Sequence, residues 1–313
     1  MGQVINSGTA IVGYSDSVLL GASKKLMLLS EFATDINLVP GSKGDIVRVP
    51  LIEDDAEDGT NSAETPSVVS GVFSESTNNF DRAKGDLKDV QVTLTSYITG
   101  RAISLAQAQN FDPLWWSNQG VYRGKKVANK VFADIVTALA GAGVADDNED
   151  IDVPASPDDF TNDYVAKEVL PAIENGLIDP SEAILVLNGL YFDALIASLT
   201  SDVYGGTEAV RNGIIPGLYG FDKIVKLTNL GSAPGYVLTR AGLAYASRQD
   251  FPLDTSVFTE FHPFVHDETG INMYSIIYTN GASGNTSYST YASYGVSAGA
   301  PSAIQKLVIG PAG

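Results

Sequence analysis

The sequence contains no cysteine. A chain without cysteine forms no disulfide, no thiolate metal site and no cysteine nucleophile, so we expect non-covalent packing, or a cross-link of another kind, to hold it together. It also has no run of about 18 or more apolar residues, which argues against a membrane-spanning helix. The first residues, MGQVINSG, lack the regions of a signal peptide and carry Asn6 where a myristoylation pattern requires Ser or Thr. These absences predict a protein that is made and used in a cytoplasm.

Basic residues are scarce in this chain. Nineteen lysines and arginines stand against 37 acidic residues, which gives a formal charge of −18. This balance favours solubility and argues against a dedicated nucleic-acid binder, although it leaves room for a local basic patch. The length of 313 residues allows one large domain or two smaller ones. The 31 glycines and 14 tyrosines are typical of a chain rich in strands and loops.

Motifs of catalysis and cofactor binding are missing. The sequence has no G-x-S-x-G motif, no P-loop and no dinucleotide fingerprint. The segment 120–125 (GVYRGK) lacks the P-loop spacing and the Ser or Thr that follows the lysine. Nothing in the spacing of the acidic residues selects a catalytic pair. We therefore expect no enzyme and no cofactor.

Metal ligands are equally sparse. The two histidines, His262 and His266, stand in FHPFVHD beside Asp267, and a His-x-x-x-His pair binds zinc when it is helical. Pro263 favours an extended chain instead, so we interpret both histidines as structural or surface residues and expect no metal site.

An acidic stretch, DDNEDID at 146–152, resembles the start of a calcium loop. It has Ile151 where the loop requires glycine and Pro157 where it requires glutamate, so the bend and the bidentate ligand are both missing. We interpret it as a solvated linker that marks the boundary of an inserted α/β subdomain.

Two segments predict a long β-hairpin. Residues 44–53 (GDIVRVPLIE) and 89–98 (DVQVTLTSYI) alternate apolar and polar side chains, and about 35 polar, acidic residues separate them. At about 3.3 Å per residue such an arm reaches up to about 80 Å, so it needs a neighbouring subunit on which to lie. Its acidic tip is either a solvated surface or a partner for a basic patch on that neighbour. The tip residues are Asp54, Asp55, Glu57 and Asp58.

The strongest helical pattern covers Ser117–Ala140. An apolar stripe through Val127, Val131 and Ile135 forms one face, and Arg123, Lys126 and Lys130 fall on the opposite face. The basic face is either an ordinary solvated surface or a stripe that contacts the phosphates of a polyanion.

The rest of the chain gives shorter elements. In the first 40 residues the pattern predicts an amphipathic helix over Asp16–Phe32, capped by Asp16 or Ser17, in an arm that packs on other elements. Later segments predict a helix at 161–177 that Pro171 kinks, a covered strand at 183–187, a helix at 190–199, a glycine-rich loop at 200–217, strands near 223–227 and 236–239, an alanine-rich segment at 241–247, and strand-like pieces over 258–309, chiefly 272–278.

The order of these parts resembles the HK97-fold major capsid protein of tailed bacteriophages, along most of the chain. The segments that carry the resemblance are GDIVRVP, DVQVTLTSYITGRAIS, VANKVFADIVTAL (127–139), ILVLNGLYFDAL (184–195) and the passages 205–225 and 235–248.

The resemblance implies an α+β fold of five parts. They are an N-arm (1–43), a β-hairpin E-loop (44–98), a peripheral domain with a long spine helix (99–149), an axial α/β domain (150–254) and return strands of the peripheral domain (255–313). The loop at 200–217 would point to the centre of a capsomer. Its residues include Tyr204, Gly205, Gly206 and Arg211.

The same resemblance implies a coat protein that assembles into hexamers and pentamers of an icosahedral shell around a double-stranded DNA genome. The family's spine helix lines the inner wall, which would place Arg123, Lys126 and Lys130 near DNA. Expected partners are a portal, decoration proteins and a separate scaffolding protein, unless a scaffolding segment has been cut away. The virion is the expected location, after assembly in the host cytoplasm.

Two alternatives stay open. One is an encapsulin-type shell that encloses a cargo enzyme. The other is a hydrolase or binding domain for which the acidic hairpin acts as a lid.

Overall fold

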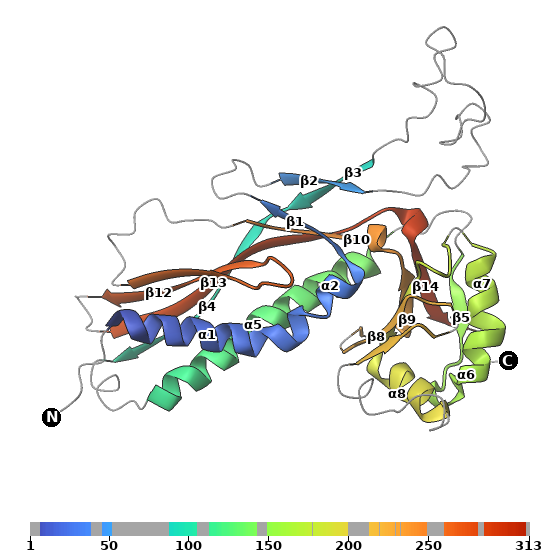
Figure 1. The fold of residues 1–313 in the computed structure, drawn as a ribbon, viewed down its shortest axis with the longest axis horizontal. Helices are drawn as coiled ribbons and strands as arrows, with labels where there is room; N and C mark the ends of the chain where they lie inside the picture. The colour runs from blue at the N-terminus through green and yellow to red at the C-terminus, as the bar shows by residue number, and fades with distance from the viewer. Residues whose placement is uncertain are drawn as a thin grey trace, which may run out of the picture. The chain divides into compact units, whose positions relative to one another are not determined.

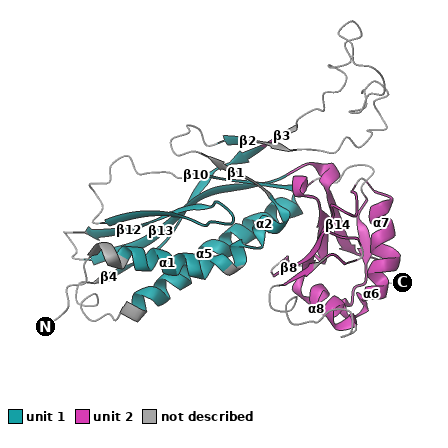
Figure 2. Cartoon of the chain, viewed as in Figure 1, with its two compact units in different colours: residues 1–49, 91–141, 243–298 teal, residues 50–90, 142–242, 299–313 magenta. Residues whose placement is uncertain are grey.

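The structure, a computed structural model, describes residues 7–38, 46–51, 88–104, 113–142, 149–176, 178–199, 213–218, 220–228, 230–231, 233–248, 260–280 and 285–310. Two compact units share the chain (Figure 2). Unit 1 takes residues 1–49, 91–141 and 243–298, and unit 2 takes 50–90, 142–242 and 299–313.

Unit 1 contains a six-stranded sheet whose longest strand is β13 (Asn285–Ala298). The strand order is β1 (Thr34–Leu38), β10 (Leu243–Arg248), β13, β12 (Asn272–Asn280) and β11 (Glu260–Val265), and β4 (Thr95–Ser104) also pairs with β13. The β4–β13 pairing is antiparallel, with Thr95 opposite Tyr294 and Ser104 opposite Asn285. Strand β13 therefore pairs with the strand that precedes it, β12, and with two strands from more distant parts of the sequence, β10 and β4.

Two long helices, α1 (Ser7–Leu26) and α5 (Pro113–Ala140), cover one face of this sheet (Figure 1). The predicted helix is confirmed and begins at Pro113, a residue suited to the first helical position because it has no N–H to leave unpaired. Its predicted apolar stripe is buried, with Val131, Ile135 and Leu139 at 0% exposure. On β13 the alternate residues Thr290 and Tyr294 bond to α1 and α5, so even-numbered residues of this strand face the helices.

The prediction of a helix over Asp16–Phe32 is confirmed for most of that range, but the predicted start and cap are wrong. Helix α1 begins at Ser7 and ends at Leu26, and a separate turn, α2 (Leu29–Phe32), follows it. Asp16 is an exposed residue inside α1, and Ser17 lies in the buried face. The helical periodicity of apolar residues is weak in this part of the sequence, because the buried face of α1 includes glycine and serine in place of large apolar side chains.

The base of the predicted hairpin is confirmed. Strands β2 (Ile46–Leu51) and β3 (Lys88–Thr93) pair in a two-stranded sheet. The predicted return strand at 89–98 is divided at Leu94, because β3 pairs with β2 whereas β4 pairs with β13. Residues 52–87 lie outside the described part of the chain.

Unit 2 contains a second six-stranded sheet with helices packed against it. The order is β5 (Ile151–Val153), β14 (Ile304–Ile309), β9 (Gly235–Leu238), β6 (Ile184–Asn188), β8 (Lys223–Leu227) and β7 (Ile214–Pro216). The predicted strand at 183–187 is β6, whose residues Ile184–Leu187 are buried. Asn188 caps the predicted helix that follows, α8 (Gly189–Ser198), because its side chain accepts from the Leu190 N–H. Phe160, Phe192 and Phe221 fill the core of this unit.

The predicted irregularity before Pro171 takes the form of a π-turn. Helix α6 (Asn162–Tyr164) passes into this turn, η3 (Val165–Val169), and then into α7 (Leu170–Glu174). Proline has no N–H for an α-helical bond to the preceding turn. The backbone widens there, and the Leu170 N–H donates to the carbonyl of Val165 five residues earlier.

Each compact unit combines segments that lie far apart in the sequence. The alanine-rich segment at 241–247, for which no strand was predicted, contributes all but the last residue of β10, which is buried along its whole length in the sheet of unit 1. Strand β14, at the end of the chain, pairs with β9 and β5 in unit 2. The pattern IQKLVI suits either sheet, because alternation does not identify a strand's partner.

Candidate functional site

Eight of the predicted site residues lie outside the described part of the chain. They are the arm-tip residues Asp54, Asp55, Glu57 and Asp58 and the loop residues Tyr204, Gly205, Gly206 and Arg211. The remaining predicted site residues, Arg123, Lys126 and Lys130, all lie on α5.

Helices α1 and α5 run parallel and touch through their backbones. Ser17 Oγ donates to Ser117 Oγ at 3.1 Å, and two turns further on Lys25 Nζ donates to Asn129 Oδ1 at 2.6 Å. A Cβ on Gly124 would lie 2.0 Å from the Val18 carbonyl oxygen, and one on Gly21 would lie 2.2 Å from that of Val121. The pair therefore forms one closely packed layer over the sheet.

Two of the three basic residues predicted to face DNA already make polar contacts within the protein. Arg123 is half-buried, and its Nη1 donates to Thr99 Oγ1 on β4 at 3.3 Å. Lys130 forms an ion pair with Asp134 one turn along the helix and lies over the ring of Tyr97, with Nζ 4.7 Å from the ring centroid. Lys126 is exposed, with its Nζ 5.4 Å from the centroid of the Tyr122 ring.

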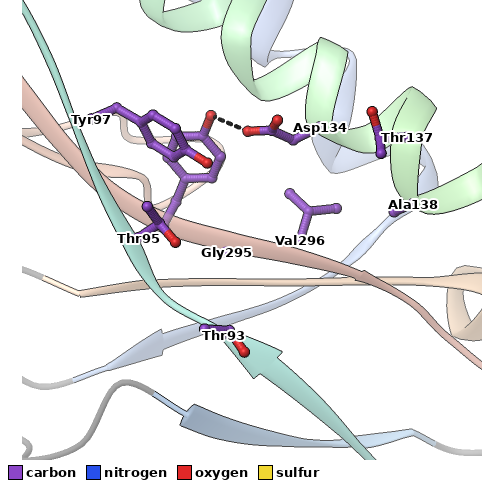
Figure 3. A pocket seen from close by; sticks show the side chains of 9 residues that line it. Thr93, Thr95, Tyr97, Asp134, Thr137, Ala138, Gly295 and Val296 are labelled. Carbon is purple, nitrogen blue, oxygen red and sulfur yellow. Dashed lines mark hydrogen bonds between the residues drawn. The ribbon is translucent and has the colours of Figure 1, made fainter.

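A polar pocket of about 280 Å³ lies where α5 meets β4 and β13 (Figure 3). The buried Tyr294 hydroxyl donates to Asp134 Oδ2 at 2.8 Å, and the rings of Tyr97 and Tyr294 stack with centroids 4.9 Å apart. Burial, followed by the bond to Asp134, raises the pKa of Tyr294 well above its usual range. The hydroxyl thus remains a donor at neutral pH. The pocket lining is Thr93, Thr95, Tyr97, Asp134, Thr137, Ala138, Tyr294, Gly295 and Val296.

The solvent face of α5 is basic and aromatic. Tyr122, Lys125, Lys126 and Asn129 are exposed on it, and Lys25 of α1 joins them through its bond to Asn129. Helix α5 contains four basic residues and a single acid, Asp134, which is already paired with Lys130. Sequence reasoning missed Lys25, because only the register between α1 and α5 brings it to this face.

The histidines take different positions on one hairpin. His262 lies on β11, where its ring stacks near Phe264 with centroids 6.3 Å apart. His266 is buried in the turn after β11, with Nδ1 2.9 Å from Thr269 Oγ1, and burial lowers the pKa of its imidazole. Among the described residues, no cluster of three or more His, Asp or Glu side chains is arranged to hold a metal ion. No helix in those same residues is both long enough and apolar enough to span a membrane.

Solved structures similar to this one match it along most of the chain. The virus-like particle from Pyrococcus furiosus has a TM-score of 0.53 and 13% identity, over 95% of this chain and 98% of that chain. The capsid of cyanophage P-SCSP1u has a TM-score of 0.51 and 13% identity, over 90% and 87%. No protein-family model and no curated protein matches the sequence. At this identity the likeness concerns the fold, and the chain has the α+β, HK97-like fold that its sequence predicts.

Proposed function

We propose that this protein is a major capsid protein, a structural component that assembles into hexamers and pentamers of an icosahedral shell around a double-stranded DNA phage genome. The observation that carries the proposal is the likeness of fold to the cyanophage P-SCSP1u capsid over 90% of the chain. The absence of a catalytic motif in the sequence agrees with a structural rather than an enzymatic role. Its location would be the virion, after assembly in the host cytoplasm.

The proposed assembly rests on one chain that makes heterologous contacts around rings of different size. In this proposal the hairpin that begins at β2 and β3 reaches a neighbouring subunit, and residues 52–87 supply the contact. The loop at 200–217 would line the capsomer centre. Proposed partners are a scaffolding protein, a portal and decoration proteins. The charge of −18 would keep dissociated subunits soluble.

The basic face of α5 is the proposed DNA-facing surface. The sequence suggests Arg123, Lys126 and Lys130 for this role. Their contacts within the protein indicate how free each side chain is to contact a phosphate. Lys126 is exposed, whereas Arg123 and Lys130 already bond to Thr99 and Asp134. Lys126, with Lys125, would therefore carry most of the phosphate contact, which needs no base reading.

Electron microscopy of the purified protein, with light scattering on the same sample, tests the proposal. Closed shells, or rings of five and six subunits, are the expected result. A uniform monomer that neither a scaffold nor a crowding agent drives into rings would overturn it and favour the hydrolase or binding domain. Nucleic acid inside purified shells separates the phage capsid from the encapsulin-type alternative, which predicts a protein cargo. The similarity to a phage capsid favours the first.

A further inference from the structure

Strand β4 forms an edge of the unit 1 sheet. Among the described strands it pairs with β13 alone, through ten consecutive positions. In an antiparallel ladder alternate residues direct their N–H and C=O groups to the partner, so about half of the backbone groups of β4 point away from β13. Such a row of backbone donors and acceptors is a template for a further strand.

The sequence of β4 has little that would block a further strand. Its ten residues, TSYITGRAIS, include no proline, no lysine and no acidic residue, and Arg101 is their only charge. At the opposite side of the same sheet, β11 carries Glu260 and Pro263, and proline removes a backbone donor. Of these two edges, only β4 presents an uninterrupted row of backbone groups.

A row of apolar side chains also ends at β4. On the sheet face away from the helices, the Tyr274 and Tyr291 rings of β12 and β13 stack with centroids 4.7 Å apart and an interplanar angle of 6°. Phe261 of β11 extends the row, with its centroid 5.4 Å from that of Tyr274. Tyr291 lies directly opposite Ile98 of β4, and Ile98 is 60% exposed. A strand added to β4 would place a side chain beside Ile98 and cover it.

We propose that β4 is a docking edge for a strand from a second copy of this chain, which extends the unit 1 sheet across a subunit boundary by β-augmentation. This inference rests on the proposed shell. The charges favour a second copy, because β4 carries one positive charge and no acid whereas the whole chain carries −18. Main-chain hydrogen bonds would hold the added strand, and Ile98 would give the contact its apolar anchor.

The lack of native cysteine makes this proposal directly testable. In an Ile98→Cys variant the only thiol lies at the edge, and a Val265→Cys variant places one on β11, where Val265 is 37% exposed. Maleimide labelling is measured on dissociated subunits and on closed shells of each variant. We expect labelling of the Ile98→Cys chain to slow at least tenfold in shells and labelling of the Val265→Cys chain to change far less. Hydrogen exchange of residues 95–104 should slow in the same shells, because a paired strand protects its amides.

The outcomes separate this proposal from the proposed function. If no variant and no wild-type protein forms shells, the proposed function fails. If shells form while the thiol at position 98 labels as fast as in subunits, the edge is open and the docking proposal is wrong. Protection of the thiol without slower amide exchange would mean that a surface covers Ile98 without strand pairing, which also overturns it. Protection that requires an added scaffolding or decoration protein would assign the edge to that protein and contradict a second copy.

Discussion

The backbone of Val18 in α1 lies so close to Gly124 in α5 that a Cβ on Gly124 would stand 2.0 Å from the Val18 carbonyl oxygen. Gly120 has the same role one turn earlier, where a Cβ would lie 2.7 Å from the Tyr14 carbonyl oxygen. The parallel contact between the helices therefore requires glycine at these positions, since any side chain there would drive the backbones apart.

We predict that Gly124→Ala destabilises unit 1 by about 2 kcal/mol or more, because the added methyl group forces α1 away from α5. Gly13→Ala is the matched control. Gly13 lies in the same helix pair, and a Cβ there would meet nothing within 4 Å. Alanine at this exposed helical position should stabilise the protein by about 0.5–1 kcal/mol, owing to its higher helix propensity. Urea unfolding of dissociated subunits measures both changes. Equal effects from the two substitutions would contradict the close contact.

The Tyr294–Asp134 bond gives a second prediction. Tyr294→Phe removes a hydroxyl that donates to a carboxylate at 2.8 Å in a largely buried position. Hydrogen bonds to charged groups contribute about 1.5–3 kcal/mol, so we expect a loss of about 1–2 kcal/mol, because Asp134 keeps its ion pair with Lys130. Tyr291→Phe makes the same chemical change on the other face of the same strand and serves as the control. If denaturant unfolding gives the two variants equal stability, the bond contributes nothing.

The outcome of the sequence-based predictions depends on how each residue is buried. Elements with large apolar side chains at a regular period, such as the stripe through Val131 and Ile135 or the strand Ile184–Asn188, were predictable from sequence. The start of helix α1 was misjudged because the helix packs through Gly21 and Ser17, whose contacts depend on a partner about 100 residues away. Lys25 was missed as a member of the basic face for the same reason.

His266 gives a prediction about pH. Burial lowers the pKa of its imidazole, so the unfolded chain binds a proton more readily than the folded chain. For this group stability is therefore full above the unfolded pKa, about 6.5, and falls as pH drops below that value. We expect the melting temperature to decrease between pH 7.5 and pH 5.5, and a His266→Gln variant to show a smaller decrease. The His262→Gln chain is the control. A decrease of wild-type size in His266→Gln would exclude His266 as its cause.

Hairpin truncation tests the arm. We predict that a chain without residues 54–76 folds and retains the cores built from the described residues, but assembles poorly because the contact to the neighbour is lost. Circular dichroism and thermal melting of the subunit check the fold, and electron microscopy checks assembly. Shells of normal yield and shape from the truncated chain would remove the arm from the assembly mechanism.

The exposed cations of α5 give the last prediction. Binding of a short double-stranded DNA is measured by fluorescence anisotropy across a salt series. The binding constant falls as salt rises, and each lost phosphate contact reduces the magnitude of the slope of log K against log salt by about 0.9. Lys126→Gln should reduce the magnitude of the slope by about that amount. Lys130→Gln should change it less, since Asp134 already pairs with Lys130, and should instead reduce stability. Lys167→Gln removes one charge from unit 2 and is the control. Equal slopes for the Lys126 and Lys167 variants would mean that the basic face of α5 has no special role in DNA contact.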